Sequence, residues 1–477
     1  MNQIIKERLR IENAIKTNDF YKLFSPYDKD IIAEIEIADS NSIELAFNNA
    51  VESYKNEMMI MPSYIKVEIL NKVADLLSTK IEEFSYTISL EGGKPLKDAI
   101  IETNRAINSI KMCATELQNL EGTQIKMDKA KGSENYTSYT FYEPLGVVLA
   151  ISAFNHPLNL ICHQVATAFA AGNSIIVKPA SQTPLSCLRL VDLFYLAGCP
   201  RKAINVLTIS GERASKIVSD SRLSFVSFIG SAKVGWDISK NVHNGVKVAL
   251  EHGGIATAVV EKTCNFDETI SSLIKGSYYH SGQVCISTQI IYVQEEISNI
   301  FLSEFISKAK ELKCANPLLI DTDMGPIVNK IELNRILDLV NDATNKGAKI
   351  ELGGKVFNEV FFEPTVITCI NEKMRISNEE AFGPIVCICA YNNINDVIET
   401  TNSKDFAFQV SIFSNNIKSI FEFSRKIVSK TVIVNEATTF RVDWMPFGGF
   451  KNSGFGVGGI KHSITDMSNE KLIILKH

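Results

Sequence analysis

Five short apolar runs alternate with helix-type segments between Gly146 and Leu250, and this alternation restricts the fold more than any other feature of the chain. The first run, residues 147–151, is apolar at every position, which is typical of a strand buried on both faces of a parallel sheet. The pattern predicts a doubly wound parallel α/β sheet, whose ligands bind at the carboxyl ends of the strands. The expected strands are 147–151, 174–178, 204–208, 225–229 and 247–250, and the expected helices are 157–171, 183–198, 213–218 and 232–238.

Polar residues or glycines follow three of these strands. The first strand leads into Ser152-Ala153-Phe154-Asn155-His156-Pro157, and the second into Lys178-Pro179-Ala180-Ser181. The fourth leads into Gly230-Ser231 and then a helix, whose free N–H groups suit a phosphate. Gly230 and Gly235 lack the Gly-x-Gly-x-x-Gly spacing of the common dinucleotide fingerprint, so this motif by itself leaves nucleotide binding open.

One of the ten cysteines lies in a distinctive loop, Ser281-Gly282-Gln283-Val284-Cys285-Ile286-Ser287. The loop falls in a second α/β segment that begins after Gly254, between an expected helix over 270–279 and an expected strand over 289–293. A thiol in a loop can be presented to a substrate. Most cysteines in an intracellular chain are small buried residues, so the loop by itself leaves a catalytic and a structural role for Cys285 both open.

The chain before Gly146 contains helices and then a ribbon. Helix-type periodicity runs from Asn41 to Ser89, and a third helix is expected over 99–117. That helix carries Glu102, Arg105 and Asn108 on one side, a pattern that favours a solvated face. Between residues 122 and 142, polar residues alternate with β-forming ones. Such a ribbon has too little core of its own and normally pairs with other structure, such as another subunit.

Length and composition restrict the class of protein. A chain of 477 residues is too long for one core and suggests about three domains or lobes. The net charge of -5 is small for this size and gives no reason to expect nucleic acid or an anionic membrane as a partner. Neither a signal peptide nor a membrane-spanning run is expected. The cysteines lack the paired spacing of a zinc site or a disulfide scaffold, which favours reduced thiols in the cytoplasm and no metal.

Seven segments in order resemble the aldehyde dehydrogenase superfamily, and the resemblance covers nearly the whole chain. They include Glu251 and Cys285, which are 34 positions apart. The segments are Ala153-Phe154-Asn155-His156-Pro157, Lys178-Pro179-Ala180-Ser181, Phe228-Ile229-Gly230-Ser231, Leu250-Glu251-His252-Gly253-Gly254, Gly282-Gln283-Val284-Cys285, Glu380-Ala381-Phe382-Gly383-Pro384 and Pro446-Phe447-Gly448-Gly449.

The resemblance implies two doubly wound parallel-sheet domains, a Rossmann-like cofactor domain and a catalytic domain, together with a small β oligomerisation element. It places the dinucleotide-binding domain at 1–124 and 145–253 and the catalytic domain at 254–455. The oligomerisation element falls at 125–144 and 456–477, and the expected assembly is a homodimer or homotetramer.

The resemblance also implies a catalytic set of three residues. Cys285 matches the thiolate that adds to an aldehyde, and Asn155 matches a donor that holds the resulting alkoxide together with the Cys285 backbone N–H. Glu251 matches the base that activates water to hydrolyse the thioester. Relatives that pass the acyl group to coenzyme A often lack this glutamate, so its presence favours release of a free acid.

The implied cofactor is NAD or NADP. Lys178 matches a contact to the adenosine ribose, Gly230 and Ser231 match contacts to the pyrophosphate, and Glu380 matches a contact to the nicotinamide ribose. Strongly NAD-selective relatives carry a glutamate where this chain has Ser181; serine removes a barrier to the 2′-phosphate of NADP without requiring it. The full expected cofactor set is Phe154, Lys178, Ser181, Gly230, Ser231, Gly235, Glu380 and Phe382.

Two residues depart from the family pattern. His252 stands where leucine usually follows the catalytic glutamate. Adjacent strand residues point to opposite faces, so packing away from Glu251 is favoured over tuning of the base. Ile229 replaces a more usual threonine in the pyrophosphate turn, where the backbone can still serve.

The tail over 432–446 is most similar to the branch that includes lactaldehyde, sulfolactaldehyde and non-phosphorylating glyceraldehyde-3-phosphate dehydrogenases. Arg441 and Arg105 are the candidate substrate contacts, although either can equally be a surface or interface arginine. A small-molecule aldehyde is therefore the expected partner, and lactaldehyde is preferred over succinate semialdehyde and glyceraldehyde-3-phosphate. An alternative of another class is a catalytically silent fold with a structural or binding role.

Overall fold

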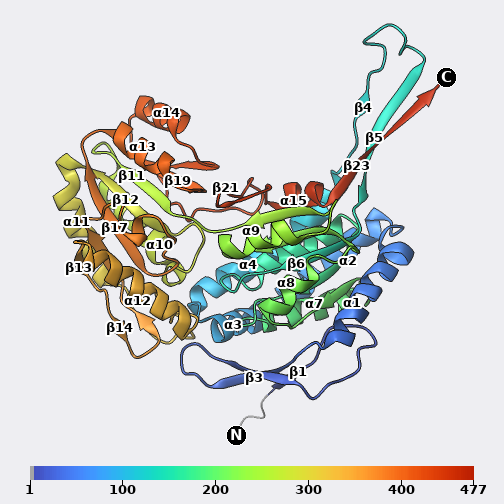
Figure 1. Ribbon diagram of the computed structural model, residues 1–477, viewed down its shortest axis with the longest axis horizontal. Helices are drawn as coiled ribbons and strands as arrows, with labels where there is room; N and C mark the ends of the chain where they lie inside the picture. The colour runs from blue at the N-terminus through green and yellow to red at the C-terminus, as the bar shows by residue number, and fades with distance from the viewer. Residues whose placement is uncertain (1–4) are drawn as a thin grey trace.

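A computed structural model describes residues 5–477 and contains two parallel-sheet α/β domains (Figure 1). The first sheet has the order β22-β10-β9-β6-β7-β8, with β6 at the point where the winding reverses. The predicted doubly wound sheet is thus confirmed. Its strands are β6 (Val147–Ile151), β7 (Ser174–Lys178), β8 (Ile204–Val206), β9 (Leu223–Ile229), β10 (Lys247–Glu251) and β22 (Gly454–Phe455).

Helices cover both faces of this sheet because alternate side chains of each strand enter different cores. In β6, Val148 and Ala150 belong to one apolar cluster, whereas Val147, Leu149 and Ile151 belong to another. The surrounding helices are α1 (Ser40–Ser53), η1 (Tyr54–Met58), α2 (Ser63–Ser78), α3 (Ile81–Gly92), α4 (Leu96–Gln118), α7 (Leu185–Ala197), α8 (Gly211–Ile217) and α9 (Ala232–Asn241).

Two local predictions were wrong. The helix expected over 157–171 is interrupted by a π-helical turn, so it runs as α5 (Asn159–Ile161), η2 (Cys162–Ala166) and α6 (Thr167–Ala170). Within this turn Gln164 donates to the carbonyls of Ile151 and Ser227, a tertiary contact that local periodicity does not encode. The predicted solvated face of α4 holds for Asn108 only, because Glu102 is fully buried.

The second sheet has the order β13-β16-β17-β12-β11-β19-β20 and is parallel except for β13. Its strands are β11 (Ala256–Val260), β12 (Thr288–Gln294), β13 (Lys349–Leu352), β16 (Thr365–Thr368), β17 (Ile385–Tyr391), β19 (Gln409–Phe413) and β20 (Thr431–Val434). Its helices are α10 (Phe266–Tyr278), η3 (Tyr279–Gly282), α11 (Glu295–Lys310), α12 (Lys330–Asn345), η4 (Arg375–Ser377), α13 (Ile394–Ser403) and α14 (Ile417–Lys426).

The stretch after this sheet returns to the first domain. β22 pairs antiparallel with β10, so Gly454 lies opposite Glu251 although the sequence places it at the end of the second domain. The short pairs β14 (Val356–Phe357) with β15 (Phe361–Phe362), and β18 (Phe406–Ala407) with β21 (Phe450–Lys451), complete this part of the molecule.

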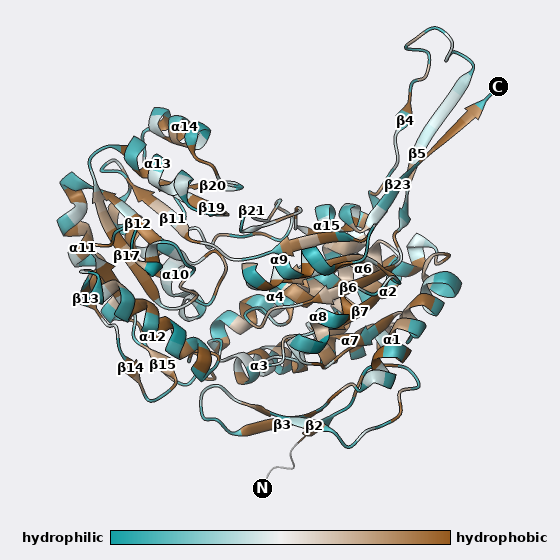
Figure 2. Ribbon diagram, in the orientation of Figure 1, coloured by the Kyte–Doolittle hydropathy of each residue, from teal (hydrophilic) through white to brown (hydrophobic). Residues whose placement is uncertain are grey.

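A three-stranded antiparallel ribbon projects away from both domains (Figure 1). It consists of β4 (Gln124–Ile125), β5 (Tyr136–Pro144) and β23 (Ser468–Lys476), and α15 (Ile460–Asp466) leads into it. Figure 2 shows β23 as largely hydrophobic beside a more polar β5. Leu472, Ile474 and Leu475 of β23 are exposed. The strand prediction for this region is confirmed, since β5 and β23 pair along their full length.

At the other end of the chain, β1 (Ile5–Glu7), β2 (Phe20–Phe24) and β3 (Ile31–Glu36) form a small sheet beneath the first domain. Within residues 5–477, no helix is both long and apolar enough to cross a bilayer.

Candidate functional site

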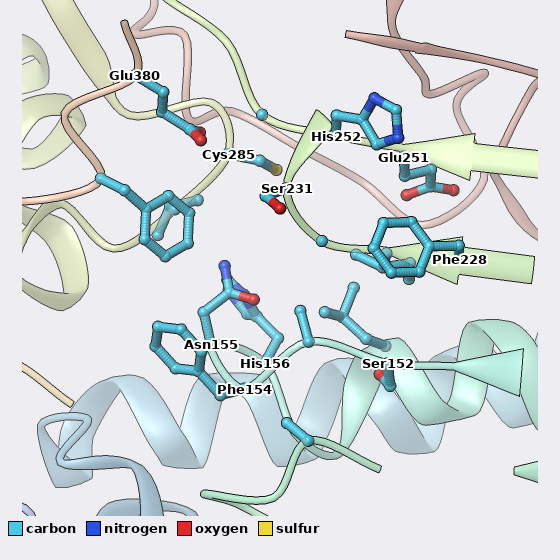
Figure 3. Close-up of a pocket in the computed structure, with 18 of the residues that line it drawn as sticks. Ser152, Phe154, Asn155, His156, Phe228, Ser231, Glu251, His252, Cys285 and Glu380 are labelled. Carbon is cyan, nitrogen blue, oxygen red and sulfur yellow. The ribbon is translucent and has the colours of Figure 1, made fainter. Parts of the chain in front are cut away.

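A cavity of about 1060 Å³ lies where the carboxyl ends of the first sheet face the loop that carries Cys285. Figure 3 shows Asn155, Glu251 and Cys285 reaching it from three separate segments. The loop after β6 supplies Asn155, the last residue of β10 supplies Glu251, and the loop before β12 supplies Cys285. The structure thus brings together three residues that are distant in sequence; the first, Asn155, and the last, Cys285, are 130 positions apart.

The loop before Cys285 is held in an unusual conformation. His280 and Ser281 have φ values of 48° and 55°, and Gly282 follows with 70°. A side chain at Gly282 would collide with the carbonyl oxygen of Gly383, so glycine is required there. The Gln283 side chain accepts a 3.0 Å hydrogen bond from the Val328 amide. This anchoring leaves the Cys285 side chain half-buried at the cavity wall.

The electrostatic environment of Cys285 favours the neutral thiol. Burial raises the pKa of Cys285 to about 12; the charge of Arg441 opposes this rise, while Glu380 and Glu251 add to it. Since a thiolate is the reactive form, the thiol must transfer its proton before it can act as a nucleophile.

Asn155 is buried and points toward the thiol loop. Its Nδ2 donates a 3.0 Å hydrogen bond to the carbonyl of Gln283. The segment after it is fixed by Glu102 of α4, which accepts 3.0 and 3.1 Å hydrogen bonds from the amides of Leu158 and Asn159. Glu102 also forms a buried salt bridge with Lys94. Glu102 therefore positions the loop of Asn155 instead of facing solvent.

Glu251 is half-buried and lines the cavity. Burial raises the pKa of its carboxyl group, and the nearby charge of Arg441 acts in the opposite direction. The backbone of Gly458 approaches the Glu251 carboxylate closely, so a side chain at Gly458 would displace that carboxylate. A carboxylate with a raised pKa in a cavity is suited to proton transfer.

His252 packs away from the Glu251 carboxylate, against α9. Its ring lies 5.5 Å from that of Trp236 and 6.0 Å from that of Phe228, and Nδ1 lies 2.9 Å from the Asn452 carbonyl oxygen. A side chain at Gly235 would collide with the His252 ring. The absence of a side chain at Gly235 thus allows this packing. Gly235 does not line the cavity, whereas the other seven expected cofactor residues do.

The part of the cavity near β7 contains a buried cation. Lys178 is 8% exposed and, within the described chain, its ammonium group has no salt bridge, while burial lowers its pKa to about 8. Ser181, Gly230 and Ser231 line the same region. A cation without a counter-ion in a cavity that hydroxyl groups and glycine also line suits the ribose and phosphates of a dinucleotide.

Glu380 and Phe382 lie at the opposite wall. Burial raises the pKa of Glu380 to about 8, and its Oε1 accepts a 3.2 Å hydrogen bond from the Gly254 amide. Phe154 and Phe382 meet edge to face at 5.8 Å. No motif indicated Arg335, which donates to the carbonyls of Glu380 and Ala381 and so holds this segment in place.

The two candidate substrate arginines occupy different environments. Arg105 donates to both oxygens of Asp443, at 3.1 and 2.8 Å, so its charge is balanced. Arg441 lies 3.6 Å from the Phe447 ring centroid, its Nε is buried without a partner, and no described residue forms a salt bridge with it. Both line the cavity. Arg441 is therefore the arginine left available for an anion.

Asp443 is a further residue that sequence patterns did not identify. Besides Arg105, it contacts His163 Nε2 at 2.8 Å and Asn159 Nδ2 at 3.1 Å. Burial acts to raise its pKa, but the hydrogen bonds and charges of His163 and Arg105 hold that pKa well below its usual range. Asp443 is a charged link between the tail segment and the first domain. No spacing in the sequence indicates this, since its partners lie about 280 to 340 positions away.

Comparison with known proteins agrees with this arrangement. The aldehyde dehydrogenase family profile matches residues 14–473. The chain is 35% identical to the 3-sulfolactaldehyde dehydrogenase of Priestia aryabhattai over 96% of this chain and 95% of that protein. It is 34% identical to the lactaldehyde dehydrogenase of Methanocaldococcus jannaschii over 95% and 96%.

A solved structure is similar throughout its length. The glyceraldehyde-3-phosphate dehydrogenase GapN from Methanocaldococcus jannaschii, complexed with NADP, superposes with a TM-score of 0.92. Its sequence is 33% identical, and the match covers 97% of this chain and 100% of that one. The family profile, the relatives and the fold agree. The chain belongs to the aldehyde dehydrogenase family of NAD(P)-dependent oxidoreductases.

Proposed function

We propose that this protein oxidises a short 2-hydroxyaldehyde, with lactaldehyde as the preferred substrate, to the free carboxylic acid with NAD or NADP. The observation that carries the proposal is the convergence of Cys285, Asn155 and Glu251 on one cavity that also contains a dinucleotide-type set of residues. The similarity to a lactaldehyde dehydrogenase and a 3-sulfolactaldehyde dehydrogenase supports the substrate class.

The first step forms a carbon–sulfur bond. The Cys285 thiol gives its proton to Glu251, directly or through water, and the thiolate adds to the aldehyde carbon. Asn155 has two amide N–H groups and uses one for the Gln283 carbonyl. The other is left, with the Cys285 backbone N–H, to hold the alkoxide.

The second stage converts the adduct into acid. The bound cofactor supplies a hydride acceptor, and loss of hydride from the former aldehyde carbon leaves a thioester on Cys285. Glu251 releases the thiol proton to solvent and then takes a proton from water, which attacks the thioester carbon; the carbon–sulfur bond breaks and Cys285 leaves as the thiolate. Burial favours this role because it raises the pKa of Glu251.

Both dinucleotides fit the residues around β7. Lys178 supplies a positive charge with no internal counter-ion, and Ser181 places no carboxylate where a 2′-phosphate would lie. The complex of GapN from Methanocaldococcus jannaschii with NADP supports acceptance of NADP. We therefore expect measurable activity with each cofactor.

A second candidate substrate class is an anionic aldehyde, such as succinate semialdehyde or glyceraldehyde-3-phosphate. The guanidinium of Arg441 favours it, because this half-buried cation lines the same cavity as the thiol, has a buried Nε without a partner and forms no salt bridge within residues 5–477. These aldehydes would use the same chemistry at Cys285 and differ only in the group that Arg441 binds.

The test is formation of reduced cofactor, followed by absorbance. Lactaldehyde, succinate semialdehyde and glyceraldehyde-3-phosphate are each supplied with NAD and with NADP. The proposal expects the highest kcat/KM with lactaldehyde. A clear preference for either anionic aldehyde would replace it with the second candidate, and no reduction with any aldehyde would favour a catalytically silent fold.

We also propose that the ribbon joins subunits into a homodimer or homotetramer. The exposed apolar residues of β23 and the open edges of the three-stranded sheet support this, because such edges are usually covered. Light scattering on the purified protein would give the assembly mass. A monomer at micromolar concentration would contradict the proposal.

A further inference from the structure

The imidazole of His156 is a polar group in the cavity that the catalytic steps above do not use. His156 follows Asn155 in the loop after β6 and lines the same cavity as Cys285. Figure 3 shows the two side chains next to each other on that loop. Neither ring nitrogen of His156 has a hydrogen-bond partner among residues 5–477, so the ring has donor and acceptor capacity to offer a ligand.

The surroundings hold the ring close to the reacting atoms. On one side, the neighbouring Asn155 is tied to Gln283, two residues before Cys285. On the other, the imidazole centroid lies 6.1 Å from the Tyr279 ring and 6.5 Å from the His280 ring. The backbone carbonyl of His156 also accepts a 3.0 Å hydrogen bond from Leu160. The ring therefore packs against Tyr279 and His280 and also lines the cavity.

Burial and the positive charges around His156 favour its neutral form. Burial is the main cause that lowers its pKa well below the usual value, and the positive charges of Lys94, Arg105 and Arg441 lower it further. A neutral imidazole carries one N–H donor and one lone pair. That combination matches a hydroxyl group, which both donates and accepts, and offers no net charge to a carboxylate or phosphate.

We propose that His156 recognises the 2-hydroxyl group of the aldehyde, and this inference rests on the proposed oxidation of a 2-hydroxyaldehyde. Carbon 2 is bonded to the carbonyl carbon that Cys285 attacks, and Asn155 holds the oxygen on that carbon. His156, the next residue of the loop, lines the same cavity, which lets its ring reach the substituent on carbon 2. Arg441 would bind the charged group that only the anionic aldehydes of the second candidate class carry, so His156 and Arg441 serve different features of a substrate.

The test compares lactaldehyde with propionaldehyde, which lacks only the 2-hydroxyl group. In H156F a ring of similar size remains and the hydrogen bond is lost, so kcat/KM for lactaldehyde should fall about tenfold. The value for propionaldehyde should stay within about twofold of wild type. H156Q keeps a donor and an acceptor and should recover most of the preference for lactaldehyde. Propionaldehyde turnover and thermal melting serve as folding controls for both variants.

The outcomes separate this inference from the proposed function. A wild-type enzyme that prefers lactaldehyde, with the preference lost in H156F and recovered in H156Q, supports both. If H156F keeps the wild-type preference, or loses activity toward both aldehydes equally, His156 does not read the hydroxyl and only the inference is overturned. If the wild-type enzyme oxidises propionaldehyde as well as lactaldehyde, the substrate proposal is overturned together with it.

Discussion

Asn155 donates a 3.0 Å hydrogen bond to the carbonyl of Gln283, which stands two residues before Cys285. This bond joins a strand end of the first domain to the thiol loop of the second. Asn155 and the Cys285 loop are therefore held in register before substrate binds, which in the proposed mechanism lowers the reorganisation needed in the transition state.

Replacing Asn155 with alanine should remove the alkoxide donor and the link to Gln283 together. We expect kcat/KM to fall by about 10² to 10³. Cofactor affinity, measured by fluorescence titration, should change little because the residues around Lys178 are untouched. A loss of kcat/KM smaller than about threefold would show that Asn155 does not stabilise developing charge.

Arg441→Ala should raise the KM for an anionic aldehyde much more than the KM for a neutral one. Loss of a hydrogen bond between charged groups corresponds to roughly a 10- to 100-fold change. Arg441→Lys retains the charge and should give an intermediate effect. Arg105 offers no clean comparison, because its removal leaves Asp443 without a counter-ion. Equal effects on both aldehydes would exclude Arg441 as an anion site.

His252→Leu should leave the pH profile of turnover nearly unchanged. The His252 ring packs between Trp236 and Phe228, its Nδ1 lies beside the Asn452 carbonyl oxygen, and its Nε2 has no hydrogen-bond partner among residues 5–477. Burial holds the pKa of His252 below its usual value, so the ring is largely neutral at pH 7. Initial rates measured between pH 5 and pH 9 test this. A displaced acidic limb in the variant would show that His252 tunes the base.

Cofactor binding should weaken as the pH rises through about 8. Burial lowers the pKa of Lys178 to about 8, so the free enzyme carries the charged ammonium below that pH and progressively loses it above. The cationic form is the one that attracts a phosphate-bearing ligand. Titration of NADP at a series of pH values should show the loss in wild type. Lys178→Met should bind more weakly and show no such dependence between pH 7 and pH 9, and a retained dependence would assign it to another group.

Breaking the buried pair of Lys94 and Glu102 should destabilise the protein. Lys94→Met leaves Glu102 charged in a buried site, and removal of one partner typically costs about 3–5 kcal/mol of unfolding free energy. The double variant Lys94→Met with Glu102→Leu should have a higher unfolding free energy than the single variant Lys94→Met, because no buried charge is left without a partner. It should nevertheless lose activity, because the Asn155 loop loses its anchor. Denaturant unfolding and turnover measure the two effects. A double variant with wild-type activity would show that Glu102 does not position that loop.

The site residues that the sequence identified share one property: each lies at the end of a strand or in a loop that has a recognisable local pattern. The apolar run over 147–151 predicts a buried parallel strand, so the position of Asn155 after it follows from topology. Glu251 ends another strand of the same sheet. Cys285 lies between a helix and a strand whose bounds were predicted within a few residues. The common location of all three at one end of the fold could therefore be predicted.

The supporting residues could not be predicted because their roles depend on segments far away in the chain. Glu102 lies on a helix face whose composition is typical of a solvated surface, yet the loop over 152–160 covers it. Asp443 is surrounded by partners from the first domain. The π-helical turn at η2 depends on the contact of Gln164 with two strands. Local periodicity carries no information about such contacts.

The most direct test of the account is mass spectrometry of a trapped acyl-enzyme. Glu251→Gln removes the base for hydrolysis and also slows acylation, because Glu251 receives the thiol proton; prolonged mixing of this variant with lactaldehyde and NADP should still leave an acyl group on the protein. Peptide mapping should place it on Cys285, and a second variant with Cys285→Ala should acquire none. An adduct on another residue, or reduced cofactor formed by the Cys285→Ala variant, would contradict the assignment of Cys285 as the nucleophile.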